Sequence, residues 1–194
     1  MSCSNTNTTH VCYDETLDDT FKTEHQNQVE LFMNKAGQHV PSYPTVPDLE
    51  TRKVRARLVL EEALELINAL GLEVRILECG NLNACDVTDT SRINIDQDFT
   101  QLDPPILSDI AKECADVIVV TTGTASSCGI GLKKIQKEVD ANNLEKFGPG
   151  SYRDNNGKWR KPTNYKKPDL TNHIEEQQLL ISQRRTDESF HGFS

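Results

Sequence analysis

The chain has 194 residues, enough for one domain with a proper hydrophobic core and flanking tails. Its formal net charge of -9 and its aromatic content of 6% argue against a general nucleic-acid binder, which needs a basic surface and stacking rings. The six cysteines form no CxxC pair, so neither a structural zinc site nor a secreted disulfide framework is expected. Without a membrane-spanning run or a basic-then-apolar leader, we expect a cytoplasmic protein with no membrane partner.

Residues 1–16 are rich in Ser, Asn and Thr, and we expect them to form a flexible tail. A first helix is predicted to end near Gly37, and three prolines make residues 38–47 an extended connector. A second helix is predicted over residues 49–70, with Asp48 as its N-cap. The apolar stripe expected on this helix consists of Val54, Leu58, Leu64 and Ile67.

The second helix carries three carboxylates on an otherwise apolar segment, at Glu61, Glu62 and Glu65. At about 100° per residue, they fall within roughly a 100° arc of the helix surface. Like charges this close repel one another, and burying them unpaired is costly. A divalent cation such as Mg²⁺, which takes oxygen ligands, removes both penalties. Taken alone, however, such a motif is more often a solvated helix face.

Residues 72–104 break the helical pattern. Alternating apolar and polar residues at 72–76 and 93–95 predict a small β-hairpin. A long apolar helix is then predicted over residues 106–128. Two cysteines of this helix are expected to be buried as small apolar residues, Cys114 and Cys128.

A second acidic pair, Glu113 and Asp116, lies in this apolar helix at i, i+3 spacing and therefore on one face. Intrahelical partners are scarce, because Lys112 adjoins Glu113 but is expected to point elsewhere. Two acidic helices packed side by side would make one metal site. The second pair therefore makes metal ligation the favoured interpretation of both motifs.

A further helix is predicted over residues 132–146, followed by a loop-like stretch at 148–170 and a short terminal helix at 174–185. The loop is rich in basic residues interleaved with aromatic rings. It could close over a ligand as a lid, or form a solvated arm, and the sequence leaves both open. Its basic and aromatic residues are Lys158, Trp159, Arg160, Lys161, Tyr165, Lys166 and Lys167.

The paired motif, Glu61-Glu62-x-x-Glu65 followed by Glu113-x-x-Asp116, resembles that of the all-α nucleoside triphosphate pyrophosphohydrolases. This superfamily includes MazG, dimeric dUTPase, phage dCTPase and phosphoribosyl-ATP pyrophosphohydrolase. The resemblance implies an all-α fold, a four- to five-helix bundle with a small β-hairpin insertion.

Two further segments carry the same resemblance. NNLEKFG at residues 142–148 is similar to the family's segment after the fourth helix, and GKWRKPTNYKKPDL at 157–170 is similar to the C-terminal tail of one branch. The similarity covers about residues 25–170. It implies one domain over residues 17–170, with 72–104 as an insertion and 171–194 as a tail.

The resemblance also implies a reaction. Family members cut a (deoxy)nucleoside triphosphate between its α- and β-phosphates, giving the monophosphate and pyrophosphate, through a metal-activated water that attacks the α-phosphate. The implied cofactor is Mg²⁺, for which Mn²⁺ can substitute, and the implied assembly is a homodimer or homotetramer. The implied metal ligands are Glu61, Glu62, Glu65, Glu113 and Asp116, with Glu61 and Glu62 as the catalytic residues.

By position in the family, four residues would contact the substrate: Asn143, Lys146, Tyr165 and Lys167. On the residues alone, Asn143 and Lys146 are ordinary features of a helix C-terminus. Two alternative functions remain: a non-catalytic nucleotide-binding or regulatory protein on the same scaffold, and a phosphoribosyl-ATP-type pyrophosphohydrolase. A di-iron carboxylate protein is disfavoured because the Glu-x-x-His pairs of that class are missing from the sequence.

Overall fold

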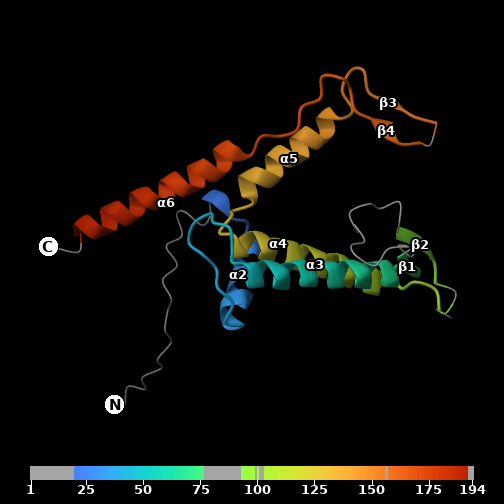
Figure 1. Ribbon diagram of the computed structural model, residues 1–194, viewed down its shortest axis with the longest axis horizontal. Coiled ribbons are helices and arrows are strands. Elements are labelled where there is room, and N and C mark those ends of the chain that lie inside the picture. The colour runs from blue at the N-terminus through green and yellow to red at the C-terminus, as the bar shows by residue number, and fades with distance from the viewer. Residues whose placement is uncertain (1–19, 77–92, 99, 101–102, 156, 192–194) are drawn as a thin grey trace, which may run out of the picture. The chain divides into compact units, whose positions relative to one another are not determined.

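The computed structural model describes residues 20–76, 93–98, 100, 103–155 and 157–191 (Figure 1). Within them the chain forms five helices and two short antiparallel hairpins, which confirms the all-α class with a small hairpin insertion. The chain divides into two compact units. One comprises residues 29–130; the other combines the residues before 29 with those after 130. The tail predicted at 1–16 lies outside the described residues, and the predicted domain limits stay a prediction.

The unit of residues 29–130 is built on two long helices that lie side by side, α3 (Leu49–Ala69) and α4 (Leu107–Ser127) (Figure 1). Helix α3 begins as predicted, since the Asp48 carboxylate accepts a hydrogen bond from the Thr51 N–H at 2.7 Å. It ends at Gly71, whose φ of +74° is a conformation that favours glycine.

The predicted hairpin is confirmed between these two helices. Strand β1 (Leu72–Ile76) pairs antiparallel with β2 (Ile93–Gln97), with Leu72 opposite Gln97 and Ile76 opposite Ile93. The Asp98 N–H donates to the Gly71 carbonyl at 3.0 Å and closes the open end of the ladder. Because a hairpin reverses the chain, α3 and α4 run antiparallel, and residues near the end of α3 face residues near the start of α4.

The interior of this unit differs from the predicted apolar stripe. Val54 is 49% exposed, whereas its neighbour Arg55 is only 8% exposed, so the stripe is wrong at this turn of α3. Arg55 approaches α4 at Gly123, where an added Cβ would lie 3.1 Å from the guanidinium. Val29 and Met33 of α2 (Glu24–Lys35) are buried on the same glycine. The expectation of a buried Cys114 is also wrong, because that thiol is exposed.

The proline-rich connector between α2 and α3 is fixed to the C-terminal end of α4. The Thr45 N–H donates to the Cys128 carbonyl at 2.8 Å. Gly129 has a φ of +67°, and a Cβ there would lie 2.1 Å from the Tyr43 carbonyl oxygen, so only glycine allows this approach.

The other unit contains the helices α5 (Lys133–Glu145) and α6 (Thr171–His191), with a hairpin between them formed by β3 (Tyr152–Arg153) and β4 (Trp159–Arg160). The α5 prediction is confirmed. The stretch predicted as a loop contains the β3–β4 hairpin, whose two-residue strands are too short to show an alternation. Helix α6 is longer than the predicted 174–185.

Gln177, a buried residue of α6, is hydrogen-bonded to Gly131, two residues before α5 begins. The Gln177 side chain accepts from the Gly131 N–H at 2.8 Å and donates to the Gly131 carbonyl at 3.0 Å. The adjacent Leu132 N–H donates to the side chain of Gln26 at 3.0 Å. Buried amides satisfied in this way fix the position of α6 within the unit.

Candidate functional site

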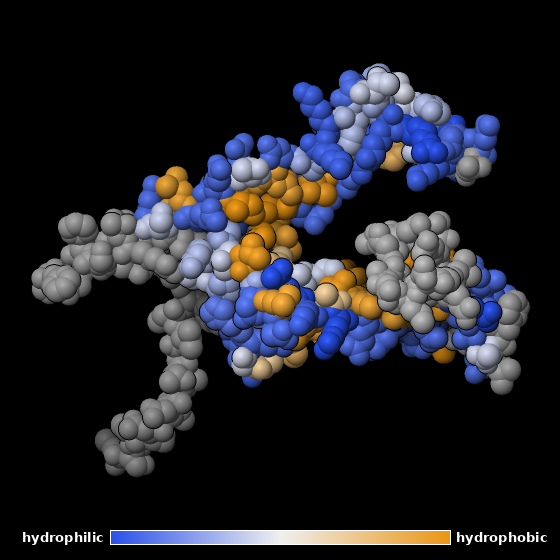
Figure 2. Space-filling model, in the orientation of Figure 1, coloured by the Kyte–Doolittle hydropathy of each residue, from blue (hydrophilic) through white to orange (hydrophobic). Residues whose placement is uncertain are grey.

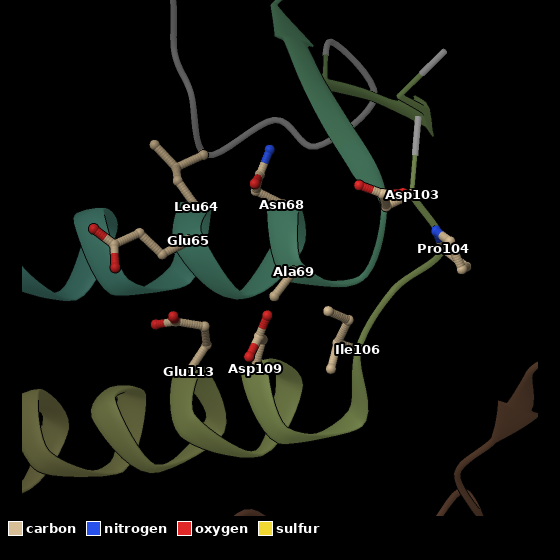
Figure 3. Close-up of a pocket in the computed structure, with 9 residues that line it drawn as sticks. All are labelled: Leu64, Glu65, Asn68, Ala69, Asp103, Pro104, Ile106, Asp109 and Glu113. Carbon is tan, nitrogen blue, oxygen red and sulfur yellow. The ribbon is translucent and has the colours of Figure 1, made fainter. Parts of the chain in front are cut away.

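Three carboxylates meet between α3 and α4. Glu62 and Glu65 come from α3 and Glu113 from α4, and one oxygen from each lies within 4.8 Å of the others. Figure 3 shows Glu65 and Glu113 facing each other across the two helices. Because residues three apart share a helix face, Glu62 and Glu65 reach α4 together. We call these three residues the acidic cluster.

The carboxylates of the acidic cluster repel one another, and this repulsion contributes to a shifted pKa at Glu62. The pKa of Glu62 is raised above its ordinary value, first by partial burial and then by the negative charges of Glu65, Asp116 and Glu113. The nearby Lys112 opposes this shift without cancelling it. A cation bound among the carboxylates would relieve the repulsion.

The donor set suits a hard divalent cation. All three groups offer carboxylate oxygens, which Mg²⁺, Mn²⁺ and Ca²⁺ prefer over nitrogen or sulfur. Opposite ligands of a Mg²⁺ ion are about 4 Å apart. Because the oxygens already lie within 4.8 Å of one another, small side-chain movements suffice to bind an ion.

Asp116 forms an ion pair with Lys112. The Lys112 ammonium lies 2.8 Å from the Asp116 carboxylate and 3.0 Å from that of Glu113. These hydrogen bonds raise the pKa of Lys112. The expectation that Lys112 points elsewhere is therefore wrong, because its long flexible side chain reaches the i+1 and i+4 positions. Asp116 is near enough to raise the pKa of Glu62 and lies beside the acidic cluster.

Glu61, the remaining predicted ligand, is exposed and is not among the three grouped carboxylates. Two carboxylates that the sequence analysis missed instead adjoin the acidic cluster. Glu65 and Glu113 line a cavity of about 640 Å³ together with Asp103 and Asp109 (Figure 3). The signal for Asp109 was its position four residues before Glu113, on the same helix face. Nothing in the sequence spacing indicated Asp103.

The predicted substrate residues belong to the other unit, and three of them are close together. The Lys146 ammonium donates to the Asn143 side-chain oxygen and lies 6.0 Å from the centre of the Tyr165 ring. A second ammonium, that of Lys161, lies 4.6 Å from the same ring. The predicted Lys167 is exposed.

The Tyr165 hydroxyl is held by a residue that the sequence analysis did not single out. It donates to the Asn142 side-chain oxygen at 2.5 Å, and the Asn142 amide donates to the Lys166 carbonyl at 2.9 Å. Tyr165 is therefore fixed with one lysine from α5 and one from the segment after β4 near its ring. The chain spacing of 142 and 165 gave no signal for this contact.

The fold is that of an all-α protein, and its acidic cluster could hold a divalent metal ion. A model of the phosphoribosyl-ATP pyrophosphohydrolase family matches residues 27–143, which is more than half of the chain and includes all of α3 and α4. The chain belongs to this family, which is part of the MazG-like superfamily, and the resemblance inferred from the sequence is confirmed. Membership supports a nucleotide pyrophosphohydrolase activity. No curated protein matches the chain.

Proposed function

We propose that the protein hydrolyses a (deoxy)nucleoside triphosphate to its monophosphate and pyrophosphate at the acidic cluster. The observation that carries this proposal is the convergence of Glu62, Glu65 and Glu113 within 4.8 Å, with a raised pKa at Glu62. These three residues would hold Mg²⁺ or Mn²⁺, with Asp116 beside them. Bound there, the ion would neutralise phosphate oxygens and make water a better nucleophile.

The chain's own carboxylates suit the proton transfer that hydrolysis requires. An attacking water must lose a proton as it bonds to phosphorus, and a carboxylate with a raised pKa accepts that proton more readily. Glu62 has this property. The exposed Glu61, next to it in the sequence, is the second candidate for the base.

The contacts around Tyr165 support phosphate-binding roles for two of the predicted residues. Lys146 offers a point charge for a phosphate, and the Asn143 side chain, whose oxygen accepts from Lys146, would offer its amide nitrogen as a donor. Tyr165, whose hydroxyl donates to Asn142, acts as a positioning residue for the two lysines near its ring. For Lys167 the support is the sequence resemblance alone.

The substrate test is pyrophosphate release from the eight common NTPs and dNTPs and from phosphoribosyl-ATP, each with Mg²⁺, with Mn²⁺ and with EDTA. We expect metal-dependent release from one or a few triphosphates. The family description favours phosphoribosyl-ATP as the alternative substrate, and release from that compound alone would replace the triphosphate proposal. Tight binding without release from any compound would favour the non-catalytic alternative.

We also propose that the protein is a homodimer or homotetramer. Large apolar side chains are exposed along α3 and α4, and Figure 2 shows apolar surface over this helical pair. Exposed apolar surface of this kind is typical of association sites. Light scattering coupled to gel filtration tests the proposal, and a monomer mass at micromolar concentration would contradict it. The residues concerned are Leu49, Val54, Leu60, Leu64, Ile106, Leu107 and Ile118.

A further inference from the structure

Arg55 is a buried cation that forms no ion pair with a carboxylate in the described part of the chain. Only 8% of the residue is exposed. Its guanidinium donates one hydrogen bond, at 2.6 Å, to the neutral side chain of Gln38. Among the residues that the structure describes, no carboxylate forms an ion pair with it. Burial lowers the pKa of Arg55, yet arginine stays protonated, so the positive charge persists inside the unit.

A buried and uncompensated charge is costly for a folded protein. The guanidinium has five N–H donors and no acceptor, and Gln38 engages only one of its nitrogens. The thiol of Cys128 is the titratable group that acts on it, but a neutral thiol is a weak acceptor. None of the remaining Arg55 nitrogens is both fully buried and without a partner, so they can donate to an anion that enters from the solvent side.

Arg55 lines a cavity that can admit such an acceptor. The cavity has a volume of about 410 Å³, and none of its lining residues is acidic. Arg52, one turn earlier on the same face of α3, lines it as well and is exposed. Arg52 likewise forms no ion pair with a carboxylate in the described part of the chain. Thr124, Ser127 and Cys128 form the α4 side of the cavity.

This cavity is separate from the acidic cluster. Arg55 precedes Glu62 by seven residues on α3, which is about 10 Å along the helix axis. The two residues of α3 lie on nearly the same face, but their charges are surrounded differently. Glu62 has three further carboxylates near it, whereas Arg55 has no carboxylate within ion-pair distance among the described residues; Asp48 and Glu50 line a second cavity with it. An anion would be repelled from the acidic cluster without metal and attracted to Arg55.

We propose that the cavity lined by Arg52 and Arg55 is an oxyanion-binding site that takes a phosphate group, either free or on a nucleotide. A phosphate accepts paired hydrogen bonds from a guanidinium and supplies the charge that Arg55 lacks. The exposed Arg52 would attract the anion at the opening, and the buried Arg55 would hold it. The inference does not depend on the proposed hydrolysis, since it requires no metal.

The test is the melting temperature of the full chain in EDTA during titration with phosphate, pyrophosphate or AMP, at an ionic strength held constant with NaCl. We expect a saturable rise with at least one of the three, because a ligand that binds only the native state stabilises it. A response to phosphate or pyrophosphate identifies the free anion, and a response to AMP alone identifies a nucleotide phosphate. No rise beyond that in NaCl would overturn the proposal.

The variant Arg55→Met keeps the length of the side chain without its charge, and it should abolish the rise. Arg55→Lys should raise the apparent dissociation constant at least tenfold, because an ammonium cannot form the paired bonds. The matched control is Arg57→Met, on the same helix but outside the cavity lining, which should behave as wild type. An undiminished rise in Arg55→Met would contradict the assignment.

Should Arg55→Met fail to fold, Ala56→Leu provides a second measurement. Ala56 lines the cavity and is exposed, so leucine can occupy part of the space without removing a charge. We expect the same loss of the phosphate-dependent rise in a folded protein. A wild-type response in Ala56→Leu would place any bound anion outside the cavity.

Discussion

At the scale of single residues, Glu62 is the group most affected by its surroundings. Partial burial first, and then the charges of Glu65, Asp116 and Glu113, raise its pKa. A metal site requires this accumulation of charge, and a metal-free helix is weakened by it. Function and stability therefore impose opposite demands on this one side chain.

We predict that Glu62→Gln lowers metal-dependent pyrophosphate release by a factor on the order of 10² or more, because it removes a metal ligand and a candidate base. The metal-free melting temperature should stay the same or rise, since one of the repelling charges is gone. Glu50→Gln, an exposed substitution on the same helix, is the control and should retain activity. Retained turnover in Glu62→Gln would show that the reaction occurs elsewhere.

Lys112 pairs with Glu113 and Asp116 and would compete for them with the proposed metal ion. We predict that Lys112→Met tightens Mg²⁺ binding, measured by calorimetry, because it removes a positive charge from beside the acidic cluster. The control is Lys53→Met, which removes an ammonium that pairs with Glu50 on the surface of α3. Weaker binding in Lys112→Met would instead mean that the lysine holds the two carboxylates in place.

Much of the candidate site could be predicted from the sequence, because helical spacing alone brings Glu62 and Glu65 to one face and Glu113 and Asp116 to another. What spacing could not give was the direction of a long side chain. Lys112 has four methylene groups and bonds Glu113, its neighbour in the sequence, as well as Asp116, which the i, i+4 spacing places on its own face. The contact between Asn142 and Tyr165 joins residues 23 positions apart and left no local pattern.

At the scale of elements, the packing of α2, α3 and α4 depends on a glycine. Gly123 lies inside α4, about one turn before the helix ends, and glycine within a helix costs about 1 kcal/mol relative to alanine. Its missing side chain leaves room for the Arg55 guanidinium, the Met33 sulfur and a Val29 methyl group. Close packing of three helices therefore compensates for a poor helix-forming residue.

We predict that Gly123→Leu destabilises the protein by about 1–3 kcal/mol or more, because the buried side chain has no space to occupy. Chemical denaturation measures the change. Ala111→Leu, at an exposed position of the same helix, should change stability by less than about 0.5 kcal/mol. Equal effects of the two substitutions would show that Gly123 is not a packing position.

Strong periodicity made α3, α4, α5 and the β1–β2 hairpin predictable, and caps and glycines gave their ends. The β3–β4 hairpin was missed because two-residue strands have no period to detect. Burial was harder to predict than helix type. Hydropathy predicts a buried Val54 and an exposed Arg55, and the structure shows the reverse. The Arg55 guanidinium approaches Gly123 and donates a hydrogen bond to the side chain of Gln38.

At the scale of the whole molecule, the raised pKa of Glu62 makes stability depend on pH. Between its ordinary value of 4.5 and its raised value, the folded protein binds a proton that the unfolded chain releases. Rising pH through this window therefore removes stability. The lowered pKa of Asp48 acts in the opposite sense, because its contribution is lost as the pH falls through the folded value.

We predict that metal-free wild type loses stability relative to Glu62→Gln as the pH rises above 4.5, measured as the difference in melting temperature in EDTA. Saturating Mg²⁺ should reverse the order, since a ligand of the native state adds about 2.7 kcal/mol at one hundred times its dissociation constant. Parallel pH profiles of the two proteins without metal would contradict the raised pKa.

None of the helices in the described part of the chain is both long and apolar enough to cross a bilayer. The exposed apolar residues of α3 and α4 are instead interleaved with charged ones, as at Arg57, Glu61 and Lys112.

The neighbouring amides of Gly131 and Leu132 are satisfied by Gln177 and Gln26, which lie on opposite sides of them in the sequence. During synthesis the chain emerges from its N-terminal end, so Gln26 is available long before Gln177. Gln177 follows Gly131 by 46 residues, so until α6 is synthesised the N–H and carbonyl of Gly131 are hydrogen-bonded to water instead. The folding order follows: the helical pair that carries the acidic cluster can form first, and the unit closed by α6 is completed last.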